Sequence, residues 1–95
     1  MIICADHGEH LGEKQFMGHS LSIYNELIRA PLIIRDPSNQ FQRGSTVDTV
    51  ISTRRLFHTV LAAAEIANDT ELELSLANSA QNAKQQDYVF AEAIP

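Results

Sequence analysis

The segment MIICADHG, residues 1–8, decides the predicted fold, because an apolar run changes abruptly into charged and glycine residues. Met1–Ala5 holds two isoleucines and no polar side chain. Such a run is typical of a buried strand in a parallel or mixed sheet. Asp6, His7 and Gly8 come next, at the carboxyl end of that strand. Open α/β sheets collect their ligand-binding groups at this edge, so the segment predicts a polar site there.

Outward from this segment, strand and helix signals alternate along the chain. Residues 6–20 form a polar segment whose glycines permit a positive φ or a close approach of another backbone, which predicts a loop. A short helix is predicted over residues 20–28. The β-rich run at residues 31–35 predicts a second strand that ends at a turn.

The second half of the chain carries one strong signal and several weak ones. Apolar residues at helical spacing over 56–64, after a polar cap, predict the clearest helix. Residues 47–51 predict a short edge strand, the Asn- and Gln-rich stretch 75–87 predicts a loop, and residues 88–94 are a third strand candidate. This alternation indicates an α/β fold. Three or four strands at most are available, so we expect part of a larger sheet.

Length and composition bound the class of protein. The 95 residues suffice for one small domain, and 44% hydrophobic with 20% charged residues is typical of globular proteins. The net charge of −5, with no basic run longer than Arg54–Arg55, argues against a nucleic-acid partner. No apolar stretch approaches the roughly 20 residues of a membrane span, and no signal-peptide pattern is present. We therefore expect no membrane partner and favour the cytoplasm. The single Cys4 excludes an internal disulfide.

The polar loop contains candidate metal and anion ligands. Asp6 offers a hard oxygen and His7 an imidazole nitrogen, a pair suited to Zn or Mn, and to Ca or Mg mainly through the oxygen. His19 follows twelve residues after His7, and a loop returning across the crevice would bring it to a bound anion. The alternative is that Asp6 caps a turn and that both histidines are solvated loop residues. Residue spacing alone leaves both interpretations open.

One glycine of the loop and the two other histidines of the chain are not interpreted as metal or anion ligands. Gly8 removes side-chain bulk where a metal or its substrate must approach. His10 has no neighbours in the sequence that single it out as a site residue. His58 lies within the strongest predicted helix, and we interpret it as structural or exposed.

Residues 4–37, CADHGEHLGEKQFMGHSLSIYNELIRAPLIIRDP, resemble the late metal-binding segment of sulfatases and of the related phosphonate and phosphate monoester hydrolases in the alkaline phosphatase superfamily. Residues 50–66, VISTRRLFHTVLAAAEI, resemble that family's next strand and helix. The combination over about thirty positions is specific, because its parts serve different physical purposes.

The resemblance implies roles for individual residues. Asp6 matches the family's late metal-binding aspartate, and His7 matches the neighbouring Asn or His ligand. His19 matches the Lys or His that contacts the sulfate or phosphate oxygens of the substrate, which makes it the candidate catalytic residue. A divalent metal is implied, Ca, Mn or Zn, and a His at the second position is more often seen with Mn or Zn. Glu9, Glu26 and Arg29 match positions that we expect to support the loop and the following helix.

The departures from the family pattern matter equally. The family nucleophile lies in a Cys/Ser-x-Pro-x-Arg signature, which this sequence lacks, and Cys4 is followed by Ala5 and Asp6 instead. The resemblance therefore implies that residues 1–95 are the rear, C-terminal portion of a sulfatase-like catalytic domain, with a partial alkaline-phosphatase-like sheet and flanking helices.

Two functions remain open. The chain is either a fragment of a metal-dependent hydrolase of sulfate, phosphate or phosphonate esters, inactive on its own, or a non-catalytic truncated remnant. The remnant would bind metal weakly or not at all, and it would form homo-oligomers through exposed sheet edges.

Overall fold

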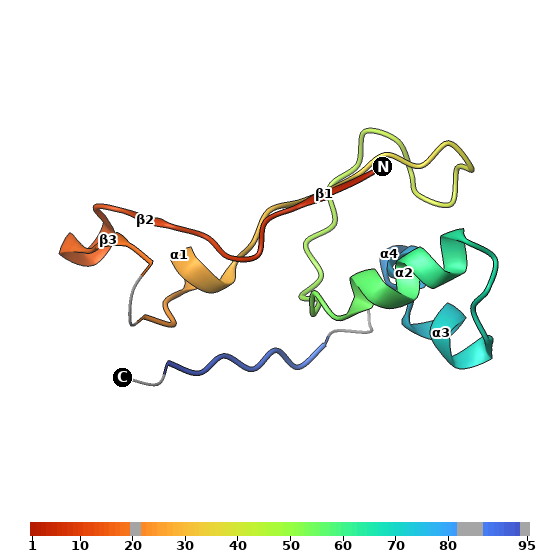
Figure 1. Ribbon diagram of the computed structural model, residues 1–95. Coiled ribbons are helices and arrows are strands. Elements are labelled where there is room, and N and C mark those ends of the chain that lie inside the picture. Colours follow the sequence, from red (N-terminus) through yellow and green to blue (C-terminus); the bar gives the residue numbers. More distant parts are fainter. Residues whose placement is uncertain (20–21, 82–86, 94–95) are drawn as a thin grey trace. The chain divides into compact units, whose positions relative to one another are not determined.

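The computed structural model describes residues 1–19, 22–81 and 87–93 (Figure 1). The chain divides into two compact units, one made of Met1–Pro37 with Phe90–Pro95 and the other of Ser38–Val89. The first unit holds four short strands and one short α-helix, and the second holds three α-helices. Strands and helices are thus both present, as the α/β prediction requires.

Strands β1 (Ile2–Cys4) and β4 (Leu32–Ile34) pair with each other in the first unit (Figure 1). The pairing is antiparallel, with Ile3 opposite Ile33, and Arg35 N–H donates to the Met1 carbonyl at 2.8 Å. Both predicted strands are therefore confirmed, but they are not buried, and the pair is antiparallel, which excludes a parallel pairing and leaves the predicted mixed sheet untested. The chain reverses direction between the two strands, and Ile3 and Ile33 stay exposed.

A tight hairpin follows β1. Strands β2 (His10–Leu11) and β3 (Met17–Gly18) pair antiparallel, with His10 opposite Gly18. The 3-10 turn η1 (Glu13–Gln15) connects them, beginning after Gly12, whose φ of 120° suits glycine. The sequence predicted a loop here, because strands of two residues are too short to show an alternating pattern.

Helix α1 (Asn25–Ile28) covers only the end of the predicted helix over residues 20–28. The start of that prediction, at residues 20 and 21, lies outside the described residues. Leu27 is the buried residue of α1 and the buried apolar side chain of the first unit.

Helix α2 (Arg55–Ala63) confirms the clearest helix prediction. Its first residue, Arg55, is buried against the chain segment at Asp87, with Nε donating to Asp87 Oδ2 at 2.6 Å and Nη2 to Oδ1 at 2.7 Å. Asp87 Oδ2 also accepts from Ser52 N–H at 2.8 Å, and Arg55 Nη1 donates to the Leu74 carbonyl at 3.1 Å. This ion pair fastens the start of α2 to two other segments of the same unit.

One helix replaces the first half of the loop predicted over residues 75–87, and another helix precedes that stretch. Helix α3 (Asp69–Leu74) has Asn68 as its N-cap. Helix α4 (Leu76–Gln81) occupies the first half of the stretch 75–87. The loop prediction is wrong over this part, because Leu76 is buried and its N–H donates to Thr59 Oγ1 of α2 at 2.9 Å. Tertiary packing of this kind overrides weak local propensity.

Two predicted strands are absent from the part of the chain that the structure describes. Residues 47–51 and 88–93 have no strand structure, and Ile94, the last residue of the second prediction, lies outside the described residues. Tyr88 and Phe90 are 87% and 92% exposed, so their β-forming side chains gain no burial.

Helices of the described residues are too short and too polar to cross a membrane.

Candidate functional site

The hairpin β2–β3 sets the geometry of the candidate site. Because His10 pairs with Gly18, the residues one step beyond the pairing, Glu9 and His19, also face each other. His19 Nδ1 lies 3.2 Å from both Oε1 and Oε2 of Glu9. The hairpin therefore returns the chain so that His19, twelve positions after His7, comes back to the loop where His7 lies.

The rings of His7 and His19 lie side by side, with centroids 4.6 Å apart and planes tilted by 36°. Both side chains are partly exposed, at 44% for His7 and 58% for His19. The structure thus brings His19 beside His7, the sequence neighbour of Asp6, on an accessible part of the first unit. Their chemical roles stay a prediction.

Asp6 and His7 hold two atoms with lone pairs, an oxygen and a nitrogen, close together. His7 Nδ1 lies 2.7 Å from the Gly8 carbonyl, and because a carbonyl oxygen only accepts, Nδ1 carries the hydrogen. In the neutral ring Nε2 then presents its lone pair, and it lies 3.7 Å from Asp6 Oδ1. The hydrogen bond to Gly8, together with the negative charge of Asp6, raises the pKa of His7 above its ordinary value.

These two side chains fit a divalent metal but do not complete a site. A histidine that ligates a metal usually donates its other ring N–H to a carbonyl or carboxylate, as His7 does to Gly8. Asp6 is 89% exposed and has oxygens to offer. Among the described residues, however, no group of three or more His, Cys, Asp or Glu side chains is placed to hold a metal ion. Any further ligands would come from elsewhere.

Gly8 is the point where another backbone comes close. A Cβ at this position would overlap with the carbonyl oxygen of Glu26 in α1, and Gly8 N–H donates to the Leu27 carbonyl at 2.6 Å. The expected close approach of another backbone in this loop is therefore confirmed at Gly8, while the approach of a metal or substrate there stays a prediction. This contact holds the Asp6–His7 segment against the helix.

His10 is a core residue that sequence reasoning passed over. It is only 2% exposed, and its Nε2 lies 3.2 Å from Ser22 Oγ. Its ring lies 5.4 Å from that of Phe16 and 6.0 Å from that of Tyr24. Residues alternate between the two faces of a strand, so His10 points inward while Glu9 and Leu11 point outward. The two-residue strands left no alternating pattern in the sequence, and the register of the hairpin separates the buried His10 from the exposed His19.

Glu26 supports the loop, in line with the role that the resemblance implied. Lys14, in the hairpin turn, donates to Glu26 Oε1 at 2.7 Å, and its Nζ lies 4.5 Å from the centre of the Tyr24 ring. This hydrogen bond lowers the pKa of Glu26. The contact joins the turn to α1 on the same unit that holds the candidate site.

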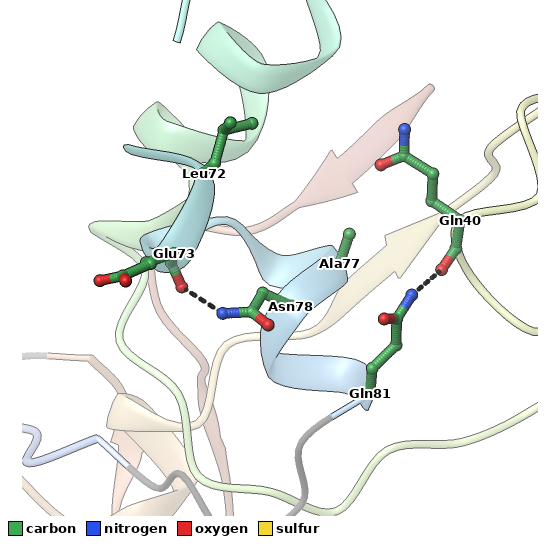
Figure 2. Close-up of a pocket in the computed structure, with 6 residues that line it drawn as sticks. All are labelled: Gln40, Leu72, Glu73, Ala77, Asn78 and Gln81. Atoms are coloured by element: carbon green, nitrogen blue, oxygen red, sulfur yellow. Dashed lines mark hydrogen bonds between the residues drawn. The ribbon is translucent and has the colours of Figure 1, made fainter. Parts of the chain in front are cut away.

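A shallow pocket lies in the second unit, whereas the candidate site belongs to the first (Figure 2). Its amide side chains already have partners, since Asn78 Nδ2 donates to the Glu73 carbonyl at 2.8 Å and Gln81 Nε2 to the Gln40 carbonyl at 3.3 Å. Figure 2 shows both bonds as dashed lines between residues that line the pocket. The pocket offers no cluster of reactive groups. Its lining consists of Gln40, Leu72, Glu73, Ala77, Asn78 and Gln81.

Both a family model and a curated relative connect this chain with the sulfatases. The family model that matches is that of the sulfatases, over residues 1–66. The uncharacterized sulfatase YidJ of Escherichia coli (strain K12) is 35% identical over 66 residues, which amount to 70% of this chain and 13% of that protein. No solved structure matches significantly. The matched span exceeds half of the chain and includes Asp6, His7 and His19, and the chain therefore belongs to the sulfatase family.

Proposed function

We propose that this chain contributes part of the active site of a metal-dependent hydrolase of sulfate esters, or of phosphate or phosphonate esters. Asp6 and His7 are the proposed metal ligands, and His19 is the proposed contact to the anion. The single observation that carries the proposal is the approach of His19 to His7, whose rings lie 4.6 Å apart, beside Asp6, the sequence neighbour of His7. Membership of the sulfatase family supports the same reading.

Each side chain has a distinct task in this proposal. Asp6 supplies an anionic oxygen and His7 supplies Nε2, which its hydrogen bond to Gly8 leaves with a lone pair. A bound divalent metal, Ca, Mn or Zn, would act as a Lewis acid on the ester oxygens. His19, when protonated, donates a charge-assisted hydrogen bond to an oxygen of the anion and so offsets the charge that develops there. The nucleophile and the remaining ligands are proposed to come from residues outside this sequence.

We further propose that β1 and β4 belong to a larger alkaline-phosphatase-like sheet. Two strands alone are rarely stable in water, and Ile3 and Ile33 leave one face of this pair open. Both outer edges of the pair are free of other strands among the described residues. Additional strands on these edges would pair the free backbone groups, and a helix packed on the sheet would bury its apolar face.

Metal binding tests the proposed ligands directly. Titration of the purified chain with Mn, Zn and Ca in a calorimeter is expected to show weak binding of at least one ion. Asp6→Ala and His7→Ala should each weaken the binding, and the double variant should abolish it, because two ligands are lost. Asp48→Ala, which removes an exposed carboxylate of the second unit, is the matched control.

Two results would contradict the assignment. Heats of binding that persist unchanged in the double variant would place the metal elsewhere. The absence of any heat with all three ions would favour the alternative, a non-catalytic remnant of the family.

A further inference from the structure

Glu9 and His19 form a contact whose purpose the proposed ligand assignments do not explain. Glu9 is neither adjacent to His19 in sequence nor part of the Asp6–His7 pair, yet both its carboxylate oxygens lie 3.2 Å from His19 Nδ1. We propose that Glu9 is a positioning residue, which fixes the His19 ring so that Nε2 is the nitrogen that meets a sulfate or phosphate oxygen. This inference rests on the proposed function, since it takes His19 as the anion contact.

The hairpin delivers this contact by its register. Glu9 precedes β2 and His19 follows β3, and the pairing of His10 with Gly18 sets them opposite each other. Gly18 has a φ of 82°, a backbone conformation that suits glycine, and a Cβ there would only touch Glu9 Oε1, at 3.6 Å. The carboxylate thus lies beside Gly18 and reaches the ring of the next residue, His19.

The chemistry of the contact determines which ring nitrogen is free. An ionised carboxylate only accepts hydrogen bonds, so Nδ1 must be the donor. The two nitrogens of an imidazole point in divergent directions, and Nε2 is therefore directed away from Glu9. In the protonated ring Nε2 also carries a hydrogen and donates to an anion, while Glu9 holds the other side of the ring.

A second neighbour restrains the same ring. The His7 ring lies 4.6 Å away at a tilt of 36°, so the ring of His19 has a carboxylate at one nitrogen and an aromatic face beside it. Holding a functional side chain by its neighbours reduces the freedom that it must lose when its ligand binds. The carboxylate acts through His19 and needs no contact with the anion.

Nitrogen NMR of the histidine side chains provides the test, at a basic pH where the nitrogen signals themselves show that the rings are neutral. In the full 95-residue chain, His19 is expected to show the Nδ1–H tautomer. Glu9→Ala should lose that preference and show both tautomers. Glu9→Gln, which keeps an acceptor oxygen of the same reach, should retain most of it. The tautomer of His58, in the other unit, is the internal control for folding in every variant.

A second measurement links the contact to the anion. Inorganic sulfate, added at a pH where the nitrogen signals show His19 to be protonated, should shift the His19 Nε2 signal. Glu9→Ala should weaken that binding about two- to tenfold, the range expected for one hydrogen bond. Glu73→Ala, which removes one negative charge from the second unit, should leave it unchanged.

The outcomes separate the two proposals. A His19 tautomer that is the same in the wild type and in Glu9→Ala, with the His58 signals intact, would overturn the positioning role. A tautomer that depends on Glu9 would support that role, even where Asp6→Ala has no effect on metal binding. A His19 signal that sulfate fails to move would overturn the anion contact and the proposed function with it.

Discussion

At the scale of single residues, one short hairpin places His10 on its buried face and His19 on its exposed face. His10 occupies the inner face and is 2% exposed, while His19 lies one step beyond the paired strands and is accessible. His7, His10 and His19, all within residues 7–19, therefore have different environments. His7 and His19 have neighbouring rings, and the proposed common ligand is assigned to this pair.

Gly8 makes a testable contribution to the same region. Gly8→Ala would force a Cβ onto the Glu26 carbonyl and would disturb the hydrogen bond to Leu27. We expect a loss of roughly 1–3 kcal/mol in the free energy of unfolding of the first unit, the usual range for overpacking. Amide hydrogen exchange at Gly8 and Leu27 measures it. Gly44→Ala, where a Cβ meets nothing within 4 Å, should leave exchange in the first unit as it is. Equal protection in Gly8→Ala and the wild type would contradict the account.

The residues of the site differ in how far the sequence could predict them. Asp6 and His7 follow an apolar run directly, so their placement at a strand end is readable from the order of residue types. Their meeting with His19 depends on the register of a hairpin with strands of two residues, too short to leave a pattern. The contact from Glu9 depends on the same register, and it was therefore out of reach of local reasoning.

At the scale of elements, the ion pair of Arg55 and Asp87 holds the helical unit together. Both side chains are 4% exposed, and the carboxylate accepts two hydrogen bonds from Arg55 and one from the Ser52 N–H. These bonds hold the pKa of the Asp87 carboxyl at about 2, below its ordinary value of 3.8. The same hydrogen bonds raise the pKa of the Arg55 guanidinium.

The lowered pKa of Asp87 predicts acid sensitivity of the helices. A carboxyl whose pKa is lower in the folded than in the unfolded chain stabilises the fold fully above the unfolded value, here 3.8. That contribution, roughly 2 kcal/mol, is lost as the pH falls from 3.8 through 2. Circular dichroism of helix content against urea at several pH values measures the loss.

Variants identify the group responsible for that acid sensitivity. Asp87→Asn should be less stable at neutral pH, because it leaves the buried Arg55 without an ionic partner, and its stability should fall less between pH 4 and 2. Asp48→Asn, at an exposed carboxylate, should behave as the wild type does. An equally steep acid dependence in Asp87→Asn would assign the transition to another group.

Helix α3 owes its start to a reciprocal cap. Asn68 Oδ1 accepts from Glu71 N–H at 3.0 Å, and Glu71 Oε2 accepts from Asn68 N–H at 2.7 Å. Asn68→Ala is expected to cost about 1 kcal/mol of unfolding free energy, measured by urea titration of the helical signal. Asn68→Asp keeps an acceptor and should stay near the wild type. If Ala and Asp at this position were equally destabilising, the cap would not be the cause.

The elements also show where prediction from the sequence ends. Helix α2 has an apolar period over nine residues, long enough to identify it. Helix α4 is six residues long and depends on burying Leu76 and on the bond from its N–H to Thr59, which only the folded unit provides. The direction of β1 relative to β4 likewise follows from the path of the chain between them, which no local pattern records.

At the scale of the whole molecule, the buried core is small. Leu27 and Leu76 are the fully buried apolar side chains of the described residues, one in each unit, and buried polar groups outnumber them. Large apolar side chains such as Ile3, Ile33 and Phe90 stay exposed. The chain also spans 13% of the sulfatase relative that it matches. The homo-oligomer inferred from free sheet edges stays a prediction.

The content of the sequence leads to a prediction for the isolated chain. We expect no measurable hydrolysis of an aryl sulfate by the purified 95 residues with Mn, Zn or Ca present, because the sequence lacks the family's nucleophile signature. A chromogenic assay measures this, with a complete sulfatase as the positive control. Sustained turnover that Asp6→Ala abolishes would show that the chain is an enzyme in its own right.

The hairpin register has a consequence for sequence variation. The pairing of β2 with β3, and not the number of residues between Glu9 and His19, keeps these two side chains opposite each other, since a one-residue slip would turn every side chain of the slipped strand to the opposite face. Insertions in the turn at residues 13–15 would be harmless as long as the pairing of His10 with Gly18 is kept. Relatives with a different turn length would therefore keep a carboxylate and an imidazole opposite each other, as Glu9 and His19 are, only where this pairing is preserved.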